Sequence, residues 1–479
     1  MLSLWPFTLM HALLPDPPMG ENQSTAALIA ACPDRRYQRC FADQLRAKYP
    51  VTQFRLPPLP RRCESAKGNV ALFDPDCTFP PAERALAPVS GPSLAMCPVA
   101  PKPTRAPPRV LKCNSAAAEI NTNVVLLLGV PSSPTATGRK RRDAIRAAWM
   151  RDDAVGRRVV VCFLLSAHTP MAQLTPMLAE NAMHDDMLFL RAPETPWLIQ
   201  SKTKYSGFKR LGRGMPTFKQ FAFFQHAAAI HQPVPFVAKI DDDTAPNLRV
   251  LVPFLERLRC AEREPYMFLG AINWAAFVPQ SNEFGVRGDR CGFGWTLQAA
   301  LSNFGTSFGT PGKKGYVEAC DTRGAVLPFP YGTGAGYIFS SALLNWVSTS
   351  EEVSTWVANA AGPTREALQW QKFEDTSTGY FVSRSPRKVH YVDVGPLIHD
   401  VACHMEGERK RRGGSTYRPP ANVSVLVHNL KGPSAFAFAW EHMQATTVPY
   451  DHTYCVRQVY KGGRAARVRR NRQAILRGQ

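Results

Sequence analysis

The sequence predicts an α/β fold whose sheet is parallel in its first half. Short apolar runs at 124–129, 159–165 and 236–240 have the length and composition of buried strands. Helical patterns at 139–149 and 215–230 separate these runs. Strands that alternate with helices are typical of a parallel sheet, and such sheets bind ligands beyond the carboxyl ends of their strands.

The remaining elements follow a less regular order. Further predicted elements are strands at 186–190, 266–271 and 424–428 and helices at 248–259 and 342–347. Residues 281–325 are rich in Gly, which predicts a long functional loop. Residues 332–336 carry three glycines after an aromatic Pro turn. They either let the backbone approach a ligand closely or form a tight turn.

The 479 residues divide by composition into four segments. Residues 1–14 are apolar but shorter than the ~20 residues of a transmembrane helix, and they lack the basic flank of a signal peptide. They could be the remnant of a membrane anchor. Residues 15–113 are rich in Pro and Cys and predict a stem or linker. Residues 114–445 hold the predicted folded domain, and 446–479 form a basic, disordered tail.

The net charge of +21 indicates a polyanionic partner, such as nucleic acid, an anionic membrane surface or a phosphate-bearing ligand. The basic residues gather in the tail and at one helix start, without a nucleic-acid-binding module. We therefore expect no nucleic acid, and a basic nucleic-acid-binding protein stays as the alternative function. Heparin chromatography and a polynucleotide filter assay would distinguish the two.

The twelve cysteines include no Cys-x-x-Cys pair, which argues against zinc ribbons and thioredoxin-like redox sites. Six of them precede Asn114, and an even set in a loop-rich region indicates disulfides and an oxidising compartment. Two glycosylation sequons, at Asn22 and Asn422, are compatible with such a compartment.

Three adjacent carboxylates follow the strand at 236–240, namely Asp241, Asp242 and Asp243. They repel one another, and the sequence offers no evident internal cation partner. A hard divalent cation with oxygen ligands would offset the repulsion. The alternative is a solvated acidic turn or the N-cap of the next helix. His428 ends an apolar run and becomes a metal ligand only if the fold brings it to the triplet.

Two further clusters could carry chemistry. The basic residues at 139–146 open a helix, and helix starts attract anions that guanidinium groups bind in a bidentate manner. The alternative is a solvated basic face. The pair Glu374–Asp375 follows Phe373, and a carboxylate with apolar and acidic neighbours can have the raised pKa of a general base. The alternative is a helix N-cap.

In chain order, the motifs resemble the β-1,3-galactosyltransferase family, glycosyltransferase family 31. They are Arg141-Arg142-Asp143-Ala144-Ile145-Arg146-x-x-Trp149, Phe163-Leu164-Leu165, Lys239-x-Asp241-Asp242-Asp243-x-x-x-Asn247, Pro330-Tyr331-x-x-Gly334-x-Gly336-Tyr337-x-x-Ser340, Glu374-Asp375-x-x-x-Gly379 and Val427-His428-x-x-Lys431. The resemblance covers residues 120–445. The residues within these motifs are also similar to those of the kinetoplastid transferases that use UDP-galactose or UDP-N-acetylglucosamine.

The resemblance implies a GT-A fold at 114–445 with a Rossmann-like N-terminal half. It implies an inverting transfer of galactose or N-acetylglucosamine from a UDP-sugar to a glycan on a glycoprotein or glycolipid, with a β-1,3 linkage. A lumenal catalytic domain at the Golgi membrane is implied too, although the anchor usual in the family is missing here. An inactive relative that binds glycans is a further alternative, which the intact carboxylates argue against.

The resemblance also assigns the site residues. The triplet matches the Asp-x-Asp motif that holds Mn²⁺ and the UDP diphosphate. By this match the metal ligands are Asp243, Asp241 and His428, the residues that bind the donor nucleotide are Arg142, Arg146, Asp241 and Asp242, and the catalytic base is Asp375. Two segments depart from the family pattern, namely Thr244-Ala245-Pro246 and Thr376-Ser377-Thr378. These departures bear on the geometry of acceptor binding and not on metal binding.

Overall fold

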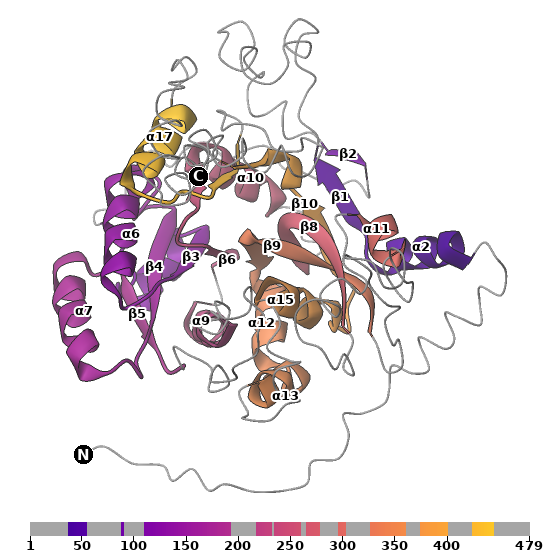
Figure 1. Cartoon of the computed structure of the whole chain (residues 1–479), viewed down its shortest axis with the longest axis horizontal. Helices are drawn as coiled ribbons and strands as arrows, with labels where there is room; N and C mark the ends of the chain where they lie inside the picture. The colour runs from indigo at the N-terminus through magenta and orange to yellow at the C-terminus, as the bar shows by residue number, and fades with distance from the viewer. Residues whose placement is uncertain are drawn as a thin grey trace, which may run out of the picture.

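The protein has a mixed α/β fold, in which helices cover both faces of a large, mostly parallel sheet (Figure 1). The computed structural model describes residues 37–54, 88–90, 110–192, 217–231, 234–259, 265–277, 296–302, 326–360, 374–400 and 424–444. Within these residues the sheet has nine strands in the order β2-β1-β10-β8-β9-β6-β3-β4-β5. The α/β prediction is therefore confirmed.

The predicted parallel half lies on one side of the sheet. Its strands are β3 (Leu126–Pro131), β4 (Val159–Ser166), β5 (Met187–Leu190) and β6 (Phe236–Ile240). All pair in parallel, with β3 between β4 and β6. Helices cover both faces, so strands such as β4 and β6 are buried along their whole length and read as continuous apolar runs.

The helices divide between two apolar clusters, one on each face of the sheet. One face is covered by α6 (Ala136–Ala147), α7 (Met171–His184), α10 (Leu248–Leu258) and α17 (Pro433–Gln444). The other carries α2 (Tyr37–Lys48), α5 (Ala117–Asn123), α9 (Thr217–Ile230), α11 (Leu297–Ser302), α12 (Ser341–Thr349), α13 (Glu351–Ala360) and α15 (Glu374–Ser383). Short 3₁₀ turns lie at Trp149–Arg151 and Gly395–Leu397.

The glycine run at 332–336 lies within a strand, so the expectation of a tight turn is wrong. The 15-residue β9 (Val326–Ser340) pairs antiparallel with β6 and with β8 (Met267–Phe277). A Cβ atom at Gly336 would lie 2.7 Å from Ile240 Cγ2, and one at Gly332 would lie 2.9 Å from Tyr337 Cβ. The glycines let the neighbouring protein segments approach closely, and a close approach of this backbone to a ligand stays a prediction.

Part of the predicted stem belongs to the sheet, which corrects the boundary at residue 114. The strand β1 (Val51–Phe54) pairs in parallel with β10 (His390–Asp393) and antiparallel with β2 (Pro88–Ser90). Cys113 forms a disulfide with Cys162 of β4, so its partner is not one of the other five N-terminal cysteines.

Other expectations fall outside the described residues. Apart from β2, the Pro-rich run at 79–109 lies there, as do most of 281–325 and all of 1–14 and 446–479. In the part of the chain that is described, no helix is long and apolar enough to cross a membrane.

A small second sheet lies beside the large one. Its strands are β7 (Ala245–Pro246), β11 (Ile398–Asp400) and β12 (Leu426–His428), in the order β11-β12-β7. β7 begins two residues after the acidic triplet, and its antiparallel partner is β12, whose last residue is His428. This pairing connects two segments that lie far apart in the sequence.

Candidate metal and catalytic site

The β7–β12 pairing brings His428 to the acidic triplet. Val427 is the register partner of Ala245, and the Leu430 amide donates to the Asp243 carbonyl at 2.9 Å. On the opposite side, the Asn247 amide donates to the carbonyl of Val425 at 2.9 Å. The backbone therefore fixes the loop after β12 against the residues that follow β6.

Asp241, Asp243 and His428 form a group that could hold a metal ion. One ligand atom from each lies within 4.8 Å of the others, and His428 Nε2 is 3.5 Å from Asp243 Oδ1. Carboxylate oxygens and an imidazole nitrogen suit Mn²⁺, Zn²⁺ or a similar divalent ion. The predicted meeting of His428 with the triplet is confirmed, and the donor set fits a divalent cation.

Each carboxylate of the triplet also has a cationic neighbour, contrary to the expectation from the sequence. Lys239 Nζ is 2.7 Å from Asp241 Oδ1, Arg141 pairs with Asp242, and Lys431 pairs with Asp243. The sequence offered no sign of these pairs, because Arg141 lies on α6 and Lys431 follows β12.

These neighbours separate the pKa values of Asp242 and Asp243. Burial raises the pKa of Asp242 to about 6, assisted by the two other carboxylates and opposed by Arg141. Burial also acts on Asp243, but Lys431 and His428 outweigh it and lower its pKa. Asp243 is therefore the more readily ionised of the two, as a metal ligand must be.

The Glu374–Asp375 pair begins α15 and faces the same site. A Cβ atom on Gly334 of β9 would lie 3.3 Å from Asp241 Oδ2 and 3.9 Å from Asp375 Oδ2. Both carboxylates thus approach one point of the β9 backbone. Because Gly334 carries no side chain, no Cβ atom fills the point that the two carboxylates approach.

Asp375 has the properties of a general base. Its pKa is raised to about 7, first by burial and then by the charge of Glu374, while the charge of Lys239 opposes this shift. Its side chain stays partly exposed, so a bound hydroxyl can reach it. Its Oδ1 accepts from the next backbone amide, Thr376 N, at 2.8 Å. A helix cap accepts from amides two or three residues on, so this contact does not support the N-cap alternative.

The site has fewer cations than carboxylates. Among the described residues the carboxylates are Asp241, Asp242, Asp243, Glu374 and Asp375, and the cations paired with them are Lys239, Arg141 and Lys431. With His428 neutral, full ionisation would leave two negative charges uncompensated. A divalent cation would supply the missing charge.

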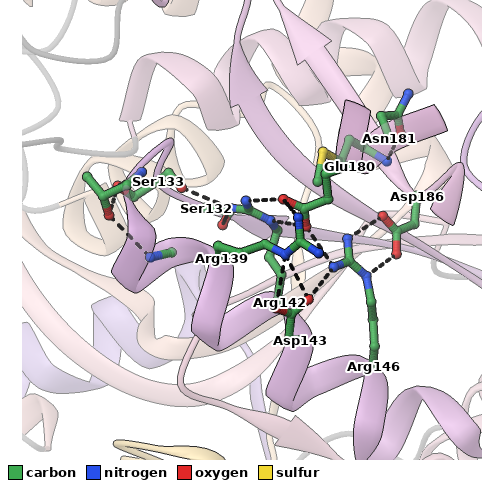
Figure 2. Close-up of polar contacts among 12 residues, drawn as sticks. Ser132, Ser133, Arg139, Arg142, Asp143, Arg146, Glu180, Asn181 and Asp186 are labelled. Carbon is green, nitrogen blue, oxygen red and sulfur yellow. Dashed lines mark hydrogen bonds and ion pairs between the residues drawn. The ribbon is translucent and has the colours of Figure 1, made fainter. Parts of the chain in front are cut away.

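Arg142 and Arg146 lie in a different cluster, on the side of α6 that faces α7 (Figure 2). Arg142 is 1% exposed and donates to both carboxylate oxygens of Glu180, to Ser132 Oγ and to the Ser133 carbonyl. Arg146 donates to both oxygens of Asp186 and to Glu180. These acceptors explain both arginines without a nucleotide, and their nucleotide-binding role remains a prediction.

Sequence reasoning missed four residues of the site, namely Arg141, Lys239, Tyr337 and Lys431. Arg141 reaches the triplet although it adjoins Arg142, because neighbouring helical residues point in different directions. Lys239 and Tyr337 are fully buried beneath the carboxylates. The one available signal was Lys239 itself, a charge inside an otherwise apolar strand, which must be paired when buried.

No protein-family model matches the chain, and a search of curated proteins finds no match either. A functional assignment therefore depends on the residues and geometry described above, together with the resemblance of the motifs.

Proposed function

We propose that this chain is an inverting glycosyltransferase with a GT-A fold. It transfers galactose or N-acetylglucosamine from a UDP-sugar to a glycan hydroxyl, and the β-1,3 linkage follows from the family resemblance. The observation that carries the proposal is the group Asp241–Asp243–His428 at the carboxyl end of β6, with Asp375 beside it. This is where sheets of this class bind ligands.

Asp241, Asp243 and His428 would hold Mn²⁺, which neutralises the charge that develops on the leaving diphosphate. Arg141 and Lys431 would assist, since their side chains are 31% and 47% exposed and lie at the same edge. When a cation binds Asp243, Lys431 can turn toward phosphate oxygens, and Arg141 stays beside Asp242 at the same edge. The donor diphosphate thereby meets positive charge at a site that is acidic without it.

Asp375 would accept the proton of the acceptor hydroxyl. A pKa near 7 suits a base that works at neutral pH. The hydroxyl oxygen forms a bond to the anomeric carbon as the bond to the UDP oxygen breaks, and UDP leaves with that electron pair. One displacement inverts the configuration, so an α-linked donor gives a β-linked product.

The compartment is part of the same proposal. The buried disulfide between Cys113 and Cys162 is typical of proteins that fold in an oxidising environment. It supports a lumenal catalytic domain in the secretory pathway, with the Golgi membrane as the expected location and glycoproteins or glycolipids as acceptors.

The test is to incubate the full chain with Mn²⁺ and a panel of UDP-sugars, and to measure UDP release with and without simple glycosides as acceptors. We expect release from UDP-galactose or UDP-N-acetylglucosamine, loss of release in excess chelator, and a β-anomeric proton in the NMR spectrum of the product. Full turnover in chelator, an α-linked product, or no release from any UDP-sugar would contradict the proposal.

A further inference from the structure

Lys239 connects the metal group with the catalytic pair. It lies on β6, two residues before Asp241, so the two side chains share one face of the strand. Its side chain is completely buried, and Nζ has three acceptors. These are Asp241 Oδ1 at 2.7 Å, Glu374 Oε2 at 2.8 Å and the Gly334 carbonyl at 3.2 Å. All three ammonium hydrogens therefore have partners.

Glu374 is held equally firmly on its other side. Tyr337 donates its hydroxyl to Glu374 Oε1 and lies 3.1 Å from Thr378 Oγ1. Thr378 donates to the Glu374 carbonyl at 2.9 Å, and Gln220 Nε2 donates to Thr378 at 2.7 Å. Both carboxylate oxygens and the backbone carbonyl of Glu374 are thus held from β6, β9 and α15, and α9 supports Thr378 through Gln220.

This arrangement differs from an ordinary buried ion pair. A structural pair needs one carboxylate for each ammonium group, whereas Lys239 has two. One belongs to the metal group, and the other adjoins the proposed base in the first turn of α15. The third contact goes to Gly334, the residue between Asp241 and Asp375. The cation therefore contacts Asp241 after β6, Gly334 of β9 and Glu374 of α15, the three segments that surround the space between Asp241 and Asp375.

We propose that Lys239 is a positioning residue, which holds Asp241 and the first turn of α15 at a fixed separation and thereby sets Asp375 against the metal group. The inference rests on the proposed transferase function for its effect on turnover. Its effect on metal binding stands apart from that function, because Lys239 contacts Asp241 whatever the reaction is.

The first consequence concerns metal affinity. Glu374 is not among the candidate ligands, but it shares the charge of Lys239 with Asp241. In Glu374→Gln the whole ammonium charge faces Asp241, so we expect Mn²⁺ to bind about tenfold more weakly. Binding is measured on the full chain, without UDP-sugar, from the electron paramagnetic resonance signal of free Mn²⁺.

The matched control is Asp186→Asn. It also removes a buried carboxylate that pairs with a cation, but in the cluster between α6 and α7. We expect its Mn²⁺ affinity to equal that of the wild type. Unchanged Mn²⁺ affinity in folded Glu374→Gln would overturn the inference, and so would a wild-type chain that binds no Mn²⁺.

The second consequence concerns turnover. The double variant Lys239→Met/Glu374→Gln removes both fully buried charges together and takes the cation only from Asp241, whose side chain is 35% exposed, so we expect the fold to be retained. We expect kcat to fall about tenfold or more with a melting temperature close to that of the wild type. In an Asp375→Asn background the same two substitutions should lower kcat less than about twofold. If they act through Asp375, their effect on kcat does not add to the effect of removing it.

The two arms distinguish the possible failures. If the wild type binds Mn²⁺ but releases no UDP, the transferase proposal fails and the metal arm still decides the role of Lys239. If the double variant loses kcat equally in both backgrounds, Lys239 supports the fold without positioning Asp375, and the inference is wrong.

Discussion

Two charged clusters of this protein contain similar residues and behave in opposite ways. The arginine cluster pairs Arg139, Arg142 and Arg146 with Asp143, Glu180 and Asp186 (Figure 2). The acidic site, defined above by its five carboxylates, has three cations. Cations and carboxylates are equal in number in the first cluster and unequal in the second.

The pKa values express the same difference. Burial raises the pKa of Glu180, but Arg142 and Arg146 outweigh it and lower the pKa overall. In the acidic site burial prevails at two carboxylates, where the pKa values rise to about 6 for Asp242 and about 7 for Asp375, while the pKa of Asp243 is lowered by Lys431 and His428. A matched cluster stabilises the charged forms, whereas an unmatched one holds carboxylates ready to bind a cation or a proton. Of this run of arginines, Arg141 reaches the acidic site, while the nucleotide-binding role of Arg142 and Arg146 stays a prediction.

The largest effect is expected for Asp243→Ala in the acidic site. It removes the carboxylate that contacts both His428 and Lys431, so Mn²⁺ and UDP-sugar binding should be lost and turnover should fall to background. The melting temperature of the metal-free protein should fall at neutral pH, because the lowered pKa of Asp243 means that Lys431 and His428 stabilise its charge in the folded state. Calorimetric titration of Mn²⁺ with UDP, together with UDP release, provides the measurement. Donor binding at wild-type strength would remove Asp243 from the metal group.

The second effect concerns stability, in the arginine cluster. Glu180→Ala leaves Arg142 buried without its carboxylate, which should cost about 3–5 kcal/mol of the free energy of unfolding. Affinity for Mn²⁺ should stay unchanged as long as the protein is folded. Urea unfolding and Mn²⁺ titration measure the two quantities, and Glu180→Gln serves if the alanine variant does not fold.

The matched control is Arg139→Ala in the same cluster. Its side chain is 39% exposed, so its ion pairs should contribute less than about 1 kcal/mol. If folded Glu180→Ala lost Mn²⁺ or donor binding instead of stability, the arginine cluster would be part of the ligand site, as the family resemblance implies for Arg142 and Arg146.

The third effect concerns the base. Asp375→Asn should lower kcat by at least ~10²-fold while Mn²⁺ and UDP affinities change little. A helix-cap role predicts near-normal kcat, since Asn caps about as well as Asp. In the wild type, kcat should rise with pH through about 7 or below, because the ionised carboxylate is the active form and a bound cation lowers its pKa.

Stability gives a second readout of Asp375, with a defined sign. Its pKa is raised on folding, so the ionised carboxylate destabilises the fold above about pH 7, and this cost fades as the pH falls toward the ordinary value of 3.8. Asp375→Asn should therefore raise the melting temperature of the metal-free protein at pH 8 and raise it less at pH 5. An equal change at both values would mean that the pKa is not raised.

The sequence by itself determined the parallel half of the sheet and the place of the triplet. The strand expected at 236–240 has these bounds in the structure. Two prolines precede its five buried residues, and three carboxylates follow them. The helix expected at 248–259 ends one residue earlier, at Leu258. Such features depend on neighbours in the chain, which composition and periodicity report directly.

Tertiary structure decided what the charged side chains do. His428 meets Asp243 only because β12 pairs with β7, and Arg142 is buried only because α7 places Glu180 beside it. Lys239 touches Glu374 across 135 residues of sequence, and β1 joins the sheet through a strand 340 residues away. A local sequence pattern does not encode contacts between residues so far apart in the sequence, because these contacts depend on the order of the strands in the sheet. The sequence therefore indicated which residues carry chemistry, and the order of the strands decided which of them meet.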